Sequence, residues 1–295
     1  MKPLVSVIIP CYNQGRFLAD ALDSVLEQAY PQWEGIIVND GSTDDTRSVA
    51  QRYTKQDARF KYVEQENRGL PGARNRGLRE TSGAYIQFLD SDDVIGSAKF
   101  ELQLALLGAS ERVALAYCDH LYGAEDDIRR TIERHRFYAP RFRMARPIED
   151  IAARWETELS IPIHCFLFDS RLFLERRIFF DERLPNHEDW DCWMRVFAFD
   201  PEVLCVPQAL AISRYHPSSM SRNVRRMRRG FLRAIDAQLS LCKEDPVLVQ
   251  ILERKRSEMK VIYALEIKAQ WSAWRQRQLP WRMLRAFRRL LGASG

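Results

Sequence analysis

Short β-branched and apolar runs alternate with longer segments of helical periodicity from the N-terminus to residue 117. The runs with strand character lie at residues 5–9, 35–39, 60–64, 84–89 and 113–117. Between the first two, apolar residues recur at spacings of one, three and four, which places them on one helix face. They are Phe17, Leu18, Ala21, Leu22, Val25 and Leu26. The alternation predicts an α/β fold in which helices flank a Rossmann-like, mostly parallel sheet.

Three carboxylates crowd the end of the fourth predicted strand, in the run Asp90-Ser91-Asp92-Asp93. Neighbouring carboxylates repel each other, whereas Mg²⁺ takes oxygen ligands, typically one or two carboxylates together with substrate phosphates. Open α/β sheets bind ligands at the carboxyl ends of their strands. The cluster therefore predicts a metal-bound phosphate substrate. A solvated acidic turn is the alternative interpretation, because Asp and Ser are ordinary turn formers.

Two further loops follow the first and second predicted strands, at residues 10–13 and 40–42. Since the carboxyl ends of parallel strands meet at one edge of a sheet, we expect these loops and the acidic cluster to form one cleft. Asp40 would accept hydrogen bonds there from a ribose or a base. Turn chemistry explains an Asp-Gly-Ser run equally well.

Four motifs in this region resemble those of family 2 glycosyltransferases in both order and spacing. They lie at residues 5–13, 38–44, 67–69 with 73–75, and 90–93, and the similarity continues less tightly to about residue 221. The resemblance implies the A-type glycosyltransferase fold. It also implies that a sugar is transferred from a nucleotide-diphosphate donor, preferably a UDP-sugar, with inversion at the anomeric carbon and with help from Mg²⁺ or Mn²⁺.

The resemblance assigns roles to individual residues. Asp92 matches the metal ligand, Asp90 is expected to reach the ribose or sugar of the donor, and Arg74 matches a nucleotide-binding arginine. Asp93 receives no definite role. The positions expected to contact the donor are Pro10, Tyr12, Asn13, Asp40, Asn67, Gly69, Arg74, Asp90 and Ser91.

A second acidic run, at residues 187–191, opens an apolar helix and resembles the family's base motif. Asp189 matches the catalytic base, and the start of a helix stabilises a negative charge. Two alternatives stay open: the carboxylates could simply favour a helix start, and His187 is a rival base. His216 resembles a late family histidine that approaches the metal or the diphosphate, with a surface histidine as the alternative.

Composition agrees with an intracellular enzyme. The chain has 295 residues, of which 46% are hydrophobic and 29% charged, as in globular proteins. Six scattered cysteines without C-x-x-C pairs argue against a disulfide framework and against structural zinc. No signal-type segment is recognised, and no run approaches about 18 uninterrupted apolar residues. We therefore expect a cytoplasmic location.

Charge divides the chain unevenly. Residues 222–295 carry 18 Lys+Arg and 6 Asp+Glu, a net charge of +12, whereas residues 1–221 have a net charge of −7. We predict a nucleotide-sugar-binding half at 1–118, an acceptor-binding half of the same domain at 119–221, and a basic helical tail at 222–295. Helices are expected over 225–243, 246–278 and 280–291, with prolines at the starts of the last two.

The end of the tail, residues 270–295, combines Trp, Leu and Phe with six arginines and no acidic residue. This composition favours an amphipathic helix on the inner face of the cell membrane over a helix packed on the catalytic domain. Such a location suits a saccharide or lipid-linked acceptor in surface glycan biosynthesis. Nucleic acid is not an expected partner, because no base-reading module is present.

The acceptor side is less well determined. Residues 129–146 are basic and loop-like, and they would either cover donor phosphates, contact an anionic acceptor or form a solvated connection. Four aromatic residues could stack on sugar rings, although such residues more often fill cores. They are Tyr138, Phe142, Trp155 and Trp190.

Other functions make different demands on the sequence. A Rossmann oxidoreductase would also place an acid such as Asp40 after its second strand, but it needs a glycine-rich loop in its first turn. That turn here is Cys11-Tyr12-Asn13-Gln14-Gly15. A sugar nucleotidyltransferase would be expected to show glycines there too and is the weaker enzyme alternative. A non-catalytic nucleotide-sugar-binding scaffold on the membrane is the alternative of another class.

Overall fold

The computed structural model describes residues 2–124, 128, 137–216 and 223–291, with side chains described as far as residue 269. Contacts divide the chain into two units, Met1–Ser219 and Met220–Gly295. The boundary lies close to the predicted start of the basic tail. The predicted division between residues 118 and 119 falls inside a strand, so the two halves of the first unit share one sheet, and that division stays a prediction.

The described part of the first unit contains an eight-stranded sheet in the order β3-β2-β1-β4-β7-β6-β8-β5. The strands are β1 (Val5–Cys11), β2 (Trp33–Asn39), β3 (Phe60–Glu64), β4 (Tyr85–Phe88), β5 (Val94–Ile95), β6 (Ala114–Ala124), β7 (Leu167–Asp169) and β8 (Glu202–Tyr215). The first four are parallel to one another, and β6 is parallel to β8. The α/β fold is confirmed.

Two differences from the sequence prediction concern the second half of the sheet. The short strand β7 enters between β4 and β6 and runs antiparallel to both. The two-residue strand β5 adds an antiparallel edge to β8. The sheet is therefore mixed: β5 and β7 run antiparallel to their neighbours, whereas β6 and β8 keep the direction of the first four strands.

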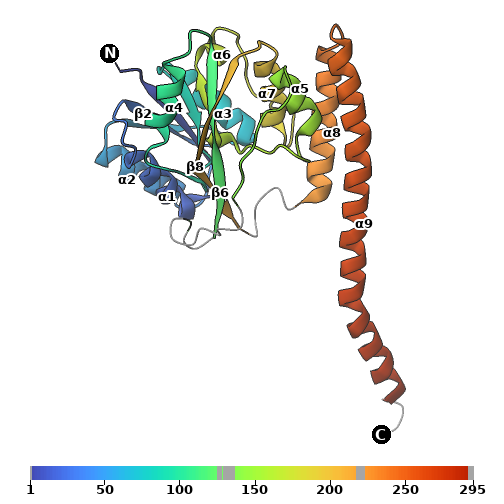
Figure 1. Ribbon diagram of the computed structural model, residues 1–295. Helices are drawn as coiled ribbons and strands as arrows, with labels where there is room; N and C mark the ends of the chain where they lie inside the picture. The colour runs from blue at the N-terminus through green and yellow to red at the C-terminus, as the bar shows by residue number, and fades with distance from the viewer. Residues whose placement is uncertain (1, 125–127, 129–136, 217–222, 292–295) are drawn as a thin grey trace. The chain divides into compact units, whose positions relative to one another are not determined.

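Helices cover both faces of the sheet (Figure 1). Those of the first unit are α1 (Gly15–Leu26), α2 (Thr46–Gln56), α3 (Gly69–Glu80), α4 (Lys99–Leu107), α5 (Pro147–Arg154), α6 (Arg171–Leu174) and α7 (Glu188–Phe197). As predicted, Leu18, Leu22 and Val25 of α1 are buried, and they join Val7 and Ile9 of β1 in one core cluster. The adjacent Ile8 points to the opposite face, because side chains alternate along a strand. There it meets α3 at Gly77, where an added Cβ would lie 2.3 Å from Ile8 Cγ2.

The pairing of β5 with β8 decides where the acidic cluster lies. β5 follows the cluster directly, and its Val94 pairs with Ile212, three residues before Tyr215 ends β8. The end of β8 and the next residue, His216, are thereby held beside the acidic turn. Two segments more than a hundred residues apart in the sequence thus become neighbours.

The second unit contains α8 (Val224–Leu241) and α9 (Pro246–Leu291). Asn223 caps α8, because its side chain accepts a hydrogen bond from the backbone N–H of Arg226 at 3.0 Å. The predicted helix start at Pro246 is confirmed. The predicted break at Pro280 is wrong, because the 46-residue helix α9 continues through this proline. A proline inside a helix removes one main-chain hydrogen bond, and the remaining main-chain hydrogen bonds keep the helix continuous. The predicted amphipathic face of residues 270–295 lies outside the described side chains.

Two predicted absences can be compared with the structure. All six cysteines belong to the described residues and are free thiols, which confirms that no disulfide framework is present. No described helix combines the length and apolar character that are required to cross a bilayer.

Candidate functional site

The acidic turn after β4 meets the end of β8 through a carboxylate and an imidazole. Asp92 Oδ2 lies 2.9 Å from His216 Nε2, and the imidazole is buried while the Asp92 side chain is 20% exposed. The Phe17 ring packs against the imidazole with their centroids 5.3 Å apart, which fixes its orientation. The two residues predicted as metal ligands therefore lie together.

The neighbouring Asp93 faces the protein interior. Its carboxylate accepts a hydrogen bond from the backbone N–H of Arg214 at 2.7 Å and lies 3.0 Å from His164 Nδ1. Burial raises the pKa of Asp93 despite the attraction of His164. Arg214 also donates to the Asp92 carbonyl at 2.8 Å and to Asp20 at 2.6 Å. Asp93 and Arg214 thus fix the acidic turn, a role that the sequence did not reveal because these contacts join distant segments.

On the expected donor side, Asp40 directly follows β2 and is buried. Its Oδ1 accepts hydrogen bonds from Gln65 Nε2 at 2.7 Å and from the Arg68 backbone N–H at 2.9 Å. Its Oδ2 is buried and has no hydrogen-bond partner among the described residues. A buried acceptor without a partner lowers the free energy of unfolding by about 1–3 kcal/mol. This oxygen is therefore suited to accept a hydrogen bond from a ligand.

The loops that follow β1 and β2 are tied to each other. Asn13 adopts a left-handed φ of 52°, and its Oδ1 accepts a hydrogen bond from the Thr43 backbone N–H at 2.8 Å. The Gly15 N–H donates to Asp44 Oδ2 at 2.9 Å. A side chain at Gly15 would collide with Asp45 and Thr46, because its Cβ would lie 2.0 Å and 2.7 Å from their nearest atoms. The two loops therefore lie side by side, and the cleft that they are expected to form with the acidic turn stays a prediction.

The other predicted donor contacts occupy the same edge. Pro10 is buried in β1, whereas Tyr12 beyond the strand is half exposed. Ser91 is buried within the acidic turn. Asn67 is exposed and accepts a hydrogen bond from the N–H of Gly69, which has a φ of 75°. These placements agree with a donor pocket, and the individual contacts stay predictions.

Arg74 of α3 joins the acidic turn to the start of α7. Its guanidinium lies 2.8 Å from Asp90 Oδ1 and 2.6 Å from Glu188 Oε1, and its side chain is only 2% exposed. Burial alone would lower the arginine's pKa, but the charges of Asp90, Glu188 and Asp189 raise it above the usual value. The predicted role of Arg74 as a direct nucleotide ligand stays a prediction, since its guanidinium bridges two protein carboxylates.

Asp189, the predicted base, lies in the first turn of α7. The carboxylate is partly exposed and accepts a hydrogen bond from the Trp190 backbone N–H at 2.7 Å. The rival His187 is buried, and its ring nitrogens contact Asn186 Oδ1 at 2.7 Å and Glu156 Oε1 at 3.2 Å. Asp189 is therefore the more accessible of the two groups, and its assignment as base stays a prediction.

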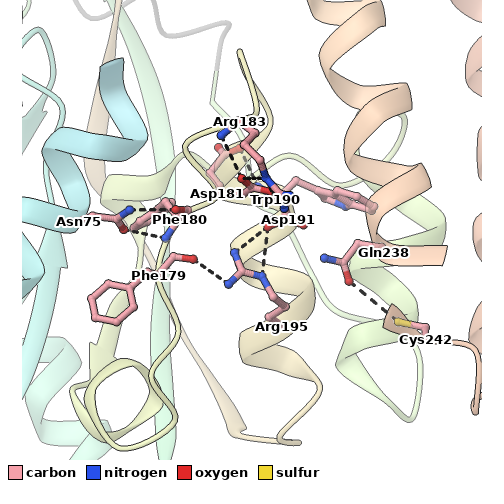
Figure 2. A network of polar contacts seen from close by, with 11 residues as sticks. Asn75, Phe179, Phe180, Asp181, Arg183, Trp190, Asp191, Arg195, Gln238 and Cys242 are labelled. Carbon is pink, nitrogen blue, oxygen red and sulfur yellow. Dashed lines mark hydrogen bonds and ion pairs between the residues drawn. The ribbon is translucent and has the colours of Figure 1, made fainter. Parts of the chain in front are cut away.

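A polar network holds α3 and α7 around the segment that precedes the second motif (Figure 2). Asn75 of α3 donates to the Phe180 carbonyl at 2.9 Å and accepts from its N–H at 2.7 Å. Arg195 of α7 donates to the Phe179 carbonyl at 2.7 Å and to Asp191 at 2.6 Å. Asp191 is thus a structural partner of Arg195. Because the network fixes α7, it also fixes the helix that carries Asp189.

The aromatic residues that were expected to stack on sugars divide into two groups. Trp155 and Trp190 are buried core residues, and Phe142 stacks on Phe197 with their centroids 5.5 Å apart. Tyr138 alone among these four is half exposed. Of the basic run at 129–146, residues 129–136 lie outside the described part, whereas Arg141 forms an ion pair with Asp119.

A divalent cation is compatible with this geometry. No group of three or more His, Cys, Asp or Glu side chains among the described residues is arranged to hold a metal ion. The Asp92–His216 pair offers one oxygen and one nitrogen. Because Mg²⁺ sites commonly use one or two protein ligands and leave the other positions to phosphates and water, this donor pair fits such an ion.

Comparisons with known proteins agree with the geometry. The family model described as glycosyl transferase family 2 matches residues 6–176. The uncharacterized glycosyltransferase EpsJ of Bacillus subtilis (strain 168) is 32% identical over 223 residues, which are 75% of this chain and 64% of EpsJ. TuaG of the same organism, provisionally named for teichuronic acid biosynthesis, is 49% identical over 107 residues, 36% of this chain and 42% of TuaG. The chain thus spans less than two thirds of either relative.

Solved structures share the fold. Staphylococcus aureus TarS 1-349 in complex with UDP-GlcNAc superposes with a TM-score of 0.60 at 20% identity, covering 80% of this chain and 66% of that one. The mannosyltransferase PcManGT from Pyrobaculum calidifontis, in complex with GDP-Man and Mn²⁺, has a TM-score of 0.62 at 17% identity, covering 96% of this chain and 83% of that one.

Proposed function

Because the chain belongs to glycosyl transferase family 2 and has the A-type glycosyltransferase fold, we propose that it transfers a sugar from a nucleotide-diphosphate donor to an acceptor hydroxyl with inversion at the anomeric carbon. The proposed donor is a UDP-sugar. The proposed acceptor is a saccharide or a lipid-linked saccharide of a surface glycan.

The observation that carries this proposal is the bridge made by Arg74. Direct displacement needs a group that deprotonates the acceptor and groups that accommodate the negative charge of the departing diphosphate. Arg74 contacts Asp90 of the acidic turn and Glu188 at the start of α7, which also carries Asp189. The arginine therefore joins the turn that carries the proposed metal ligand Asp92 to the helix start that carries the proposed base.

The orphan Oδ2 of Asp40 supports a nucleoside donor. A buried carboxylate oxygen accepts hydrogen bonds only, and the imide N–H of uracil is a suitable donor. Guanine also presents a ring N–H that could donate to Asp40. Because PcManGT is solved with GDP-Man, guanine is the alternative to uracil as the base of the donor. The structures of TarS with UDP-GlcNAc support our preference for UDP.

In the proposed reaction, Asp189 accepts the proton of the acceptor hydroxyl as the hydroxyl oxygen attacks the anomeric carbon. The bond between that carbon and the diphosphate oxygen breaks on the opposite face, and the nucleoside diphosphate leaves with the electron pair. One displacement inverts the configuration. In this proposal Asp90, held by Arg74, orients the donor, and Arg214 keeps the acidic turn in position.

Asp92 and His216 are the residues that would hold Mg²⁺ or Mn²⁺. When bound there, the ion would supply positive charge to the diphosphate. The Mn²⁺ in the structure of PcManGT supports a divalent ion in the proposed reaction.

Release of UDP from a UDP-sugar, with transfer measured in parallel, tests the proposal. We expect Asp189→Asn and Asp92→Asn to lower turnover by roughly 10²–10⁴-fold, the usual contribution of a general base or of comparable charge stabilisation. The matched control is Asp200→Asn, because Asp200 is exposed and its one ion pair among the described residues is with Arg112. Turnover that is unaffected by either site variant would refute the assignment.

The choice of donor is tested by thermal unfolding with a panel of nucleotide-sugars and Mn²⁺, because a ligand that binds only the folded chain raises its Tm. We expect a UDP-sugar to give the largest increase. A larger increase with a GDP-sugar would reject the uridine preference without rejecting the reaction.

A further inference from the structure

A small pocket lies on the acceptor side of the first unit. Its volume is about 200 Å³. It is lined by Tyr138, Ala139, Pro140, Glu156, Thr157, Glu158, Leu159 and Ser160. Pockets for drug-sized ligands usually measure roughly 300–1,000 Å³, so this one suits a ligand of about one sugar ring.

Tyr138 gives the pocket a rigid aromatic wall. Its backbone pairs with His120 of β6 through two hydrogen bonds of 2.9 and 3.0 Å. The tyrosine ring stacks on the His120 imidazole with their centroids 5.1 Å apart and an interplanar angle of 8°, and the Tyr122 ring packs against it edge-on. Burial lowers the pKa of His120 to about 3, so its ring is neutral. Tyr138 is nevertheless 47% exposed, which leaves aromatic surface available to a ligand.

Glu156 gives the pocket a fixed hydrogen-bond acceptor. This residue has a left-handed φ of 63°, unusual for glutamate, and the turn is closed by its N–H donating to the Leu159 carbonyl at 3.1 Å. The Glu156 side chain is 31% exposed while Oε1 contacts His187 Nε2 at 3.2 Å. His187 itself has a left-handed φ of 57°. Residues held in such conformations cluster at functional sites.

The contact between Glu156 and His187 links the pocket to the proposed base. His187 is the N-cap residue of α7, and Asp189 follows two positions later. The Trp190 indole N–H donates to the Ile151 carbonyl at 3.0 Å, which ties α7 to the helix that leads into the Glu156 turn. A molecule in the pocket would therefore lie beside the start of α7.

We propose that this pocket binds one pyranose ring of the acceptor, and the inference rests on the proposed function. An aromatic face and a carboxylate are complementary to a sugar, whose ring carbons present an apolar face and whose hydroxyls donate hydrogen bonds. Tyr138 stacks on the ring and Glu156 accepts from its hydroxyls. The substrate class is therefore a saccharide acceptor whose own sugar is recognised.

Ligand-observed NMR on the full chain, with a panel of methyl glycosides of hexoses and N-acetylhexosamines at millimolar concentration, tests the proposal. We expect at least one glycoside to bind, and Tyr138→Ala to weaken its binding at least about tenfold. Tyr138→Phe, which keeps the ring, should bind within about twofold of the wild type. Phe137→Ala is the matched control, because Phe137 is an exposed aromatic neighbour that does not line the pocket.

Thermal unfolding of each variant checks that it is folded. If Tyr138→Ala does not fold, saturation transfer from the wild-type aromatic protons to one face of the glycoside ring provides the second measurement. The proposal is overturned by wild-type binding in folded Tyr138→Ala, by an equal loss in Phe137→Ala, by saturation spread evenly over both ring faces, or by the failure of every glycoside to bind.

Release of UDP by the wild-type chain without any glycoside, in which water replaces the acceptor hydroxyl and the free sugar is formed, tests the underlying function separately. Release without glycoside binding would reject the pocket and retain the function. Glycoside binding that depends on Tyr138, without any release of UDP from the donor panel, would retain a sugar-binding pocket and reject the transferase proposal.

Discussion

Arg74 is the residue on which the geometry of the site depends most. Replacing it by Met would leave Glu188 buried and Asp90 without its cation, and breaking a buried ion pair in this way costs about 3–5 kcal/mol. We therefore expect Arg74→Met to lower the free energy of unfolding by about that amount and to abolish transfer. Urea unfolding followed by circular dichroism measures the change.

Arg76→Met is the control for this prediction. Arg76 is on the same helix, but its ion pair with Glu80 is exposed: the Arg76 side chain is 43% exposed and that of Glu80 is 36% exposed. Exposed pairs contribute about 0–1 kcal/mol, so this variant should be nearly as stable as the wild type. An equal loss in both variants would contradict the role given to the bridge.

The buried Lys99 makes stability depend on pH. Its ammonium donates to Gln87 Oε1 and Gln103 Oε1, both at 2.5 Å, and burial lowers its pKa from 10.5 to about 8. Between these pH values the unfolded chain keeps the proton that the folded chain has lost. The contribution of Lys99 to the free energy of unfolding should therefore increase as the pH rises from about 8 to 10.5.

The comparison with Lys99→Met isolates this contribution from that of the other titrating groups. The free energy of unfolding of the wild type, minus that of the variant, should rise across this interval in urea titrations at successive pH values. A difference that stays flat or falls would show that Lys99 is not perturbed in the way described.

At the scale of elements, Gly77 sets the distance between α3 and β1. An alanine there would place its Cβ 2.3 Å from Ile8, a stiff, buried side chain, so we expect Gly77→Ala to cost about 1–3 kcal/mol. Gly96→Ala is the control, because its Cβ would meet nothing closer than 3.5 Å. Thermal unfolding should therefore show a lower Tm only for Gly77→Ala, and equal Tm values would contradict this packing argument.

The first half of the sheet was predictable because each element there has its own pattern. β1 to β4 are apolar runs bounded by turn residues, and α1 shows clear helical spacing. β8 was missed because Pro207 interrupts it and its register with β6 shifts near Asp119. β5 and β7 have two and three residues, too few for any periodicity, and exist because neighbouring strands pair with them.

The same limit applies to the site. Asp40, Asp92 and Asp189 could be named as candidates because they lie in local motifs that resemble those of the family, and their roles stay predictions. The contact of Asp93 with Arg214 joins residues 121 positions apart, and that of Glu156 with His187 depends on two unusual backbone conformations. Local sequence contains no signal for either contact.

At the scale of the whole molecule, the basic tail predicts membrane association. Residues 270–295 carry six arginines, and each basic residue near an anionic leaflet contributes roughly 1 kcal/mol. We expect the full chain to float with vesicles that contain anionic lipid, less so at high salt, and a chain ending at residue 269 to remain behind. Vesicles of neutral lipid are the control. Equal flotation of both chains would contradict membrane binding through residues 270–295.

The free cysteines of the first unit have a practical consequence. Cys11, Cys165 and Cys192 are buried, and burial raises the pKa of each thiol, so alkylating reagents should reach them only when the structure opens. Labelling kinetics would then report local opening at three positions of the first unit without any introduced probe. Since Cys11 ends β1, directly before one of the loops that are expected to contact the donor, its labelling should slow most when a nucleotide-sugar is bound.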